Sequence, residues 1–149
     1  MPDTSTGFLG RGWQFPPRFT LSSDPNGDPV SAGSVEMAAA DQDIRQSLIV
    51  LFATLRGERI MRPDYGLGVH PFVLGPMDET HLGELRSQIE DAILFFEPRI
   101  KIDTIDMDTS GAPDGCLHIH LHYWIPAINS RSNMVYPYYF SEGTNVSAP

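Results

Sequence analysis

Hydrophobic residues recur with a helical period in two segments of the chain. The first segment starts at Asp41, a residue type that often caps helices, and Gly57 closes it. In the second segment Asp78 stands at the cap position, and Pro98 stops the helix. The apolar positions that share one face are Ile44, Leu48, Leu51, Phe52 and Leu55 in the first segment, and Leu82, Leu85, Ile89, Ile93 and Phe96 in the second. The pattern predicts two amphipathic helices.

Beyond Pro98 the hydrophobic period changes to two, which is typical of strands. A first strand contains Ile100, Ile102 and Ile105, and a turn follows at residues 111–115. In the next strand the apolar residues of one face are Leu117, Ile119, Leu121, Tyr123 and Ile125, whereas His118, His120, His122 and Trp124 lie on the other face. The pattern therefore predicts a hairpin with one buried face.

A third strand is predicted near the C-terminus. Its residues are Met134, Val135, Tyr136, Pro137, Tyr138, Tyr139 and Phe140. Because Pro137 lacks the N–H that a central strand donates, the strand is expected at the edge of the sheet.

The first 35 residues lack a helical period and are rich in Pro and Gly, which favours an extended arm with turns. The arm contains Trp13, Phe15 and Phe19, which are costly to leave in water. They are expected to pack on the chain's own domain or on a neighbour. We thus predict an arm at 1–35, an α+β domain of two helices on a small antiparallel or mixed sheet at 36–141, and a loose tail at 142–149.

Composition narrows the class of function. The formal net charge is −9, which disfavours nucleic acid as a partner. Cys116 is the single cysteine, so no internal disulfide is expected, and no apolar run reaches the length of a membrane span. Assembly in the cytoplasm is therefore expected. Residues 56–68 contain three Arg among turn residues and predict an ordered loop.

Two groups of residues suggest chemistry at first sight. His118, His120 and His122 lie on one strand face at about 7 Å intervals, so a metal is conceivable, but the pattern supplies no second shell, and a polar or interface face is favoured. Acidic residues near the hairpin lack the spacing of a calcium loop. No nucleophile elbow or phosphate-binding loop is present in the sequence. The sequence thus favours a non-enzymatic protein without cofactors or metal.

Glu97, Pro98 and Arg99 form a corner where the second helix stops and a strand begins. Pro98 fixes the backbone, so the two charged side chains are presented in restricted directions, suited to charge-assisted pairs with a partner. An intramolecular Glu97–Arg99 ion pair is an equally good interpretation. Arg99→Ala is expected to leave the monomer folded but to stop its incorporation into an assembly, since an exposed ion pair contributes little to stability whereas a desolvated one at an interface matters more.

Five segments resemble, in the same order, the GPW-type baseplate wedge family of contractile phage tails, type VI secretion systems and extracellular contractile injection systems. They are residues 9–19, 43–47, 57–68, 97–99 and 129–140. The resemblance implies a structural subunit, present in multiple copies in a symmetric particle, whose corner at Glu97, Pro98 and Arg99 contacts the helical core bundle of the wedge. It also implies that the sheath subunit adds strands to the sheet, for which the edge at 134–140 is suited.

The implied partners are other wedge proteins and the sheath subunit, with inner-tube, spike or hub proteins as further candidates, in a particle that is released or docked at a membrane. Two alternatives stay open. One is a lysozyme-like enzyme acting on peptidoglycan through carboxylates such as Glu58, Asp64 and Glu97, which would need two carboxyls about 5–9.5 Å apart in a cleft. The other is an adaptor that binds metal through the three histidines.

Overall fold

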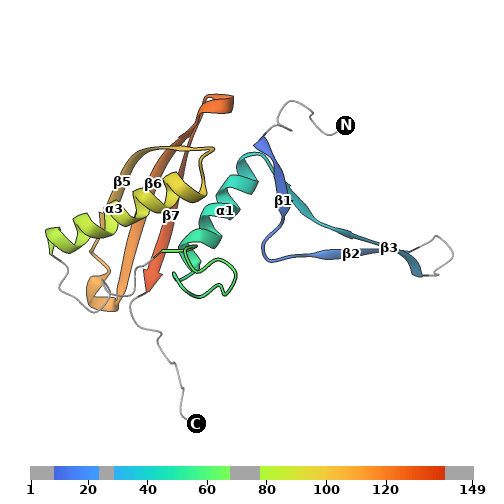
Figure 1. Ribbon diagram of the computed structural model, residues 1–149, viewed down its shortest axis with the longest axis horizontal. Helices are drawn as coiled ribbons and strands as arrows, with labels where there is room; N and C mark the ends of the chain where they lie inside the picture. Colours follow the sequence, from blue (N-terminus) through green and yellow to red (C-terminus); the bar gives the residue numbers. More distant parts are fainter. Residues whose placement is uncertain (1–8, 24–28, 68–77, 140–149) are drawn as a thin grey trace, which may run out of the picture. The chain divides into compact units, whose positions relative to one another are not determined.

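The computed structural model describes residues 9–23, 29–67 and 78–139. Helix α1 spans Asp41–Ala53, and within it the chain divides into two compact units, Met1–Val50 and Leu51–Pro149. Figure 1 shows the elements of each unit in the order of the sequence. In the described residues, the first unit has two two-stranded sheets and the second has a three-stranded sheet. The α+β class predicted from the sequence is confirmed.

The described part of the arm consists of paired strands. Strand β1 (Arg11–Trp13) pairs with β4 (Met37–Ala39), and β2 (Phe19–Ser23) pairs with β3 (Pro29–Val35), both antiparallel. Glu36 links the two pairs, because its carbonyl accepts from the Gln14 N–H and its own N–H donates to the Arg18 carbonyl, each at 3.0 Å. Backbone hydrogen bonds thus organise this segment into paired strands, which its irregular pattern of side chains did not predict.

Helix α1 is shorter than its hydrophobic pattern predicts. Asp41 is the first helical residue and not the cap, because the carbonyl that accepts from the Ile44 N–H belongs to Ala40. The helix ends at Ala53, four residues before Gly57. Leu67 causes the early end, since its N–H donates to the Thr54 carbonyl at 3.0 Å and draws the chain out of the helix.

Helix α3 (Glu79–Phe96) confirms the second predicted helix. The Asp78 side chain caps it by accepting from the His81 N–H at 2.9 Å. Glu97 is the C-cap, and its ψ of 67° lies outside the helical range, as expected because Pro98 disfavours a helical conformation in the residue before it. The face predicted to be apolar is buried at Leu85, Ile89 and Ile93.

Strands β5 (Lys101–Asp108), β6 (Cys116–Ile125) and β7 (Ser130–Tyr139) form an antiparallel sheet in that order. Short 3-10 turns at Ala112–Asp114 and Pro126–Ile128 connect them. Strand β6 is central and has the predicted two faces. Its buried residues include Leu117, Ile119, Leu121, Tyr123 and Ile125, each at most 2% exposed.

A bulge in β5 explains an irregular spacing in the sequence. Ile102 and Ile105 are three positions apart, although a strict alternation places residues of one face two apart. The pairing with β6 shifts register between Ile102 and Thr104, so Ile102 lies opposite Tyr123 and Ile105 opposite Leu121. Because Tyr123 and Leu121 are both buried, the bulge keeps the two isoleucines on the inner face.

Strand β7 is longer than predicted. It starts at Ser130, four residues before Met134, directly after Asn129 with its positive φ of 50°. Phe140, the last residue of the predicted strand, lies outside the described residues, as does the predicted tail at 142–149. In the described part of the chain, no helix is long and apolar enough to cross a membrane.

Candidate assembly interfaces

Strand β7 is an edge strand with a regular ladder on its inner side. Ten residue pairs join it to β6 without a shift of register, from Cys116↔Tyr139 to Ile125↔Ser130. Among the described residues no strand pairs with its other side. In an antiparallel ladder, alternate residues direct their N–H and C=O groups away from the partner strand. The outer border of β7 therefore carries hydrogen-bonding groups along its length, except at Pro137, which has no N–H.

The side chains of β7 alternate strictly. Met134 is buried and Tyr136 is half-buried, with its ring 5.3 Å from that of Phe52. Burial raises the pKa values of Tyr136 and Tyr138 above that of a free tyrosine. On the opposite face, Val135 is 48% exposed and Tyr139 is 66% exposed. Strand β7 thus offers apolar side chains beside the border with which no described strand pairs.

Strand β5, at the other edge of the sheet, is less suited to pairing. It carries four exposed charged residues, Lys101, Asp103, Asp106 and Asp108, whereas Arg131 is the one charged residue of β7. Strand β5 also contains the bulge described above. Charges and bulges on edge strands are the features that discourage pairing with another chain. The two edges of the sheet therefore differ in charge and in regularity, and β7 is the edge with fewer features that discourage pairing.

The outer face of the sheet is polar and arranged in cross-strand rows. His118 lies between Asp108 and Pro137, and His120 lies between Asp106 and Val135. These rows place carboxylates beside the imidazoles, where opposite charges across strands are favourable. Asp108 has a pKa below its usual value, mainly because the backbone N–H of Ser110 donates to it, with a smaller contribution from His118 and His120.

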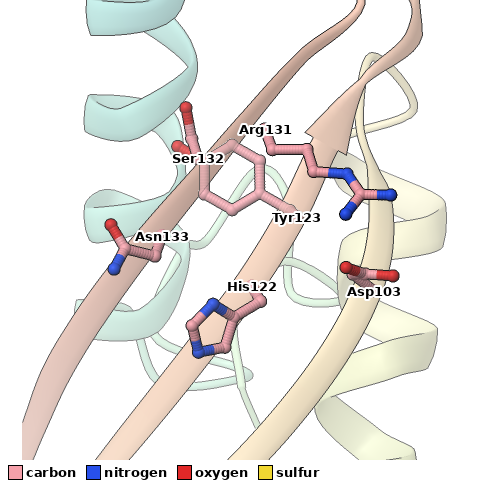
Figure 2. A pocket seen from close by; sticks show the side chains of 6 residues that line it. All are labelled: Asp103, His122, Tyr123, Arg131, Ser132 and Asn133. Atoms are coloured by element: carbon pink, nitrogen blue, oxygen red, sulfur yellow. The ribbon is translucent and has the colours of Figure 1, made fainter.

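A shallow recess of about 300 Å³ continues this face toward the other end of the strands, and Figure 2 shows the side chains around it. Asp103 comes from β5, His122 from β6, and Arg131 and Asn133 from β7. Three strands thus contribute acidic, basic and amide groups to one hollow.

The three histidines do not gather around one point. His118, His120 and His122 face outward, as predicted, but they occupy successive rows of the ladder. Within residues 9–23, 29–67 and 78–139, no three His, Cys, Asp or Glu side chains are grouped so that they could hold a metal ion. The geometry presents the imidazoles as a row on a surface and not as a ligand set.

The corner after α3 contains an intramolecular ion pair. Arg99 Nε donates to Glu97 Oε1 at 2.6 Å and Nη2 donates to Oε2 at 2.7 Å, a bidentate arrangement. Glu97 is 2% exposed, whereas the Arg99 side chain is 30% exposed. The intramolecular interpretation of the pair is confirmed, and the expectation of an exposed pair is wrong for Glu97. Removing Arg99 would leave a charge buried without its partner, which argues against a stable Arg99→Ala monomer.

The predicted Arg-bearing loop is ordered and lies against the end of α3. Tyr65 contacts Phe96, with ring centroids 5.0 Å apart, and the Arg59 guanidinium lies 4.2 Å from the Tyr65 ring centre. Burial raises the pKa of Tyr65, an effect that Arg59 opposes and Glu97 reinforces. The loop and the corner therefore form one continuous surface.

The three aromatic residues of the arm are exposed. Trp13, Phe15 and Phe19 are 64%, 57% and 65% exposed, and Trp13 meets Phe19 edge-on with centroids 6.3 Å apart. Between Trp13 and Phe19, the Phe15 N–H donates to the side-chain oxygen of Gln46 at 3.0 Å. This hydrogen bond ties the backbone of the arm to α1 at that point.

The carboxylates considered for an enzyme are engaged in structural contacts. Glu58 accepts from the Leu55 N–H at 3.0 Å and Asp64 lies 3.7 Å from Arg62. Glu97 is buried against Arg99. Each of the three acids has a charged or backbone partner of its own.

Sequence reasoning missed Ile60 and Met61, which are 94% and 90% exposed in the Arg-bearing loop. Their apolar character was visible in the sequence, but their position at the surface depends on hydrogen bonds that close the loop.

A sheet edge with which no described strand pairs is the kind of surface to which a strand of another protein can add. The family model described as Baseplate wedge protein gp25 matches residues 38–130, and the chain belongs to this family. A Geobacter sulfurreducens protein with the provisional name tail lysozyme shares 34% identity, with a TM-score of 0.67 over 74% of this chain and 99% of that one. The comparison with curated proteins gave no match.

A structure of the baseplate of the anti-feeding prophage, symmetrised six-fold, contains a second similar chain. It shares 28% identity with a TM-score of 0.58, and the likeness covers 95% of this chain and 94% of that chain. This likeness extends over the arm as well as the sheet.

Proposed function

We propose that the chain is a structural subunit of the baseplate of a contractile injection particle and starts the sheath by strand addition at β7. The observation that supports the proposal most strongly is the difference in charge and regularity between the two edge strands of the sheet, β7 and β5. One is a ten-residue strand with unbroken register and a single charged residue, and the other is bulged and carries four charges. An extended arm of the sheath subunit would hydrogen-bond to the border of β7, while Val135 and Tyr139 contact its side chains.

Membership in the baseplate wedge family and the likeness to a chain of a six-fold baseplate support this role. In such a particle several copies act together, so a modest contact at each edge gains strength through avidity. The corner at Glu97, Pro98 and Arg99 would dock the helical core of the wedge. Its backbone is fixed by Pro98 and by the buried ion pair.

The exposed aromatic residues of the arm fit an assembly role better than a monomer. Trp13, Phe15 and Phe19 each leave more than half of their surface in water. Burying one such side chain contributes roughly 1.5–3 kcal/mol. We propose that the arm packs on a neighbouring subunit, in a particle assembled in the cytoplasm.

The name of the Geobacter relative raises peptidoglycan hydrolysis as an alternative. Glu58, Asp64 and Glu97 each already have a partner, and Glu97 is shielded from solvent. We therefore propose that the chain is not an enzyme and needs no metal or cofactor. Turnover of peptidoglycan by the purified protein, abolished by mutating one of these acids, would contradict this.

The sheath-starting role is tested by Val135→Lys in particles assembled from the complete gene set. A lysine on the edge strand should weaken strand addition. We expect baseplates that contain the variant but carry few or no sheaths, counted by electron microscopy. His120→Lys is the matched control, because His120 is the ladder partner of Val135 on the central strand and shares its face. Normal sheaths with Val135→Lys would argue against β7 as the acceptor.

A further inference from the structure

Residues 54–67, which follow α1, form a loop that is closed by backbone hydrogen bonds. The Leu67 N–H donates to the Thr54 carbonyl and the Arg56 N–H donates to the Leu67 carbonyl, so the base of the loop is closed. Inside it, the Gly57 N–H donates to the Pro63 carbonyl at 2.8 Å. Compact loops closed at the base in this way often carry function. Figure 1 shows the loop in green after the end of α1.

The closed loop holds two large apolar side chains in water. Ile60 and Met61 are 94% and 90% exposed, more than any other large hydrophobic residue of the described chain. Neighbouring backbone is ordered by bonds from the Arg62 N–H to the Arg59 carbonyl and from the Tyr65 N–H to the Arg62 carbonyl. Exposed apolar residues on a preordered segment lose little conformational entropy on binding, which favours a contact site.

Cationic side chains flank the apolar tip. Arg56, Arg59 and Arg62 lie within seven residues and are three of the nine arginines of the chain. Two of them lie over aromatic rings: Arg59 over Tyr65 at 4.2 Å and Arg62 over Phe96 at 5.9 Å from the ring centres. Stacking on a ring holds a guanidinium in place while its edge stays available to carboxylates, and the Arg62 edge already lies 3.7 Å from Asp64.

A recess lies beside the loop at the end of α3. It has a volume of about 290 Å³, and Phe95, which is 70% exposed, forms part of its wall. Its lining residues are Arg56, Asp64, Asp91, Ala92, Phe95 and Phe96. An apolar side chain of a partner could enter this hollow between the Arg56 side chain and the helix.

We propose that this loop–helix surface, comprising Arg56, Ile60, Met61, Arg62 and Phe95, binds an acidic segment of another baseplate protein that carries an apolar anchor residue. Charge complementarity identifies the occupant: the chain as a whole carries a net charge of −9, whereas in residues 56–64 the three arginines outnumber the two acids, Glu58 and Asp64. The inference rests on the proposed baseplate role and deepens it. The Glu97–Arg99 pair acts as a positioning element, because it fixes the helix end on which Phe95 and Phe96 lie.

Other occupants fit less well. An anionic membrane or a nucleic acid would meet the repulsion of a chain with 19 acidic and 10 basic residues. A second copy that docks through the same surface would place arginine side chains against arginine side chains. These occupants are outcomes that the experiment distinguishes.

The test combines a variant with a cross-link in particles assembled from the complete gene set. Ile60→Ser with Met61→Ser should lower incorporation into baseplates at least about tenfold, as expected for the apolar centre of an interface. The double variant should keep the unfolding midpoint of the wild type in urea, because both side chains are exposed in the monomer. Leu94→Ser is the matched control, an apolar residue that is 77% exposed on α3 outside this surface, and should incorporate normally.

A photo-reactive amino acid at position 61 identifies the occupant. We expect cross-links to a peptide of another baseplate protein that is rich in Asp or Glu, and their yield should fall with salt. Normal incorporation of the double variant, or cross-links to a second copy, to lipid or to nucleic acid, would overturn the inference while the baseplate role stands. A wild-type chain that never enters baseplates would instead overturn the proposed function.

Discussion

At the scale of single residues, the Glu97 carboxylate illustrates how burial changes the meaning of a motif. Two N–H groups of Arg99 hold its two oxygens at 2.6 and 2.7 Å, and the carboxylate has almost no contact with solvent. A pair of this kind adds little to stability compared with apolar residues, yet it is costly to break.

Arg99→Ala should therefore destabilise the chain. The buried Glu97 charge would lose its partner, at a cost of roughly 3 kcal/mol. The measurement is the free energy of unfolding from urea denaturation. Glu97→Gln combined with Arg99→Met is the control, since removing both charges should cost clearly less than removing Arg99 alone. Equal losses in the two variants would show that the pair is not desolvated.

Gly66 closes the base of the loop with a backbone conformation that side chains rarely adopt. Its φ is 108°, and a Cβ at this position would collide with the Thr54 carbonyl oxygen. Gly66→Ala should cost about 2–3 kcal/mol of unfolding free energy. Gly83→Ala is the matched control, because Gly83 lies exposed in α3 with no atom near its Cβ position, and it should stabilise the chain by about 1 kcal/mol. A harmless Gly66→Ala would mean that the loop is not closed in this way.

At the scale of elements, the sequence predicted best where local signals agree. Helix α3 has a cap at Asp78, an apolar face and a stop at Pro98, and strand β6 has strict alternation. Long-range backbone contacts decided the rest. The bond between Leu67 and Thr54 ended α1 early, and the pairing with β6 set the start of β7 at Ser130.

The candidate site was predicted only in part for the same reason. The edge position of β7 followed from Pro137, a local property of the residue. The burial of Glu97 and the exposure of Ile60 depend on how the loop packs against the end of α3. Nothing in the periodicity of the sequence encodes that contact.

The cap of α3 gives a pH dependence with a definite sign. The His81 backbone N–H bonded to Asp78 lowers the pKa of this carboxyl below its unfolded value of about 3.9. A lowered folded-state pKa stabilises the fold above the unfolded pKa, and this contribution is lost as the pH falls through the folded pKa. Asp78→Ala should therefore lower the urea midpoint at pH 7, and the difference from the wild type should shrink in acid. A difference that stays constant with pH would contradict the charged cap.

At the scale of the whole molecule, the proposals give the border of β7 and the loop–helix surface separate roles. The border of β7 would receive a strand of the sheath, and the loop–helix surface would bind within the baseplate. A variant of the first surface should form baseplates without sheaths, whereas a variant of the second should not enter baseplates at all. These two phenotypes would separate the entry of the chain into the baseplate from the start of the sheath.

The most direct measurement is a cryo-EM map of the assembled particle at a resolution that separates strands. The account predicts a polypeptide from the sheath beside β7, hydrogen-bonded to the backbone between Ser130 and Tyr139. A complete sheath in which that border of β7 faces solvent, or is covered by the chain's own residues, would contradict it.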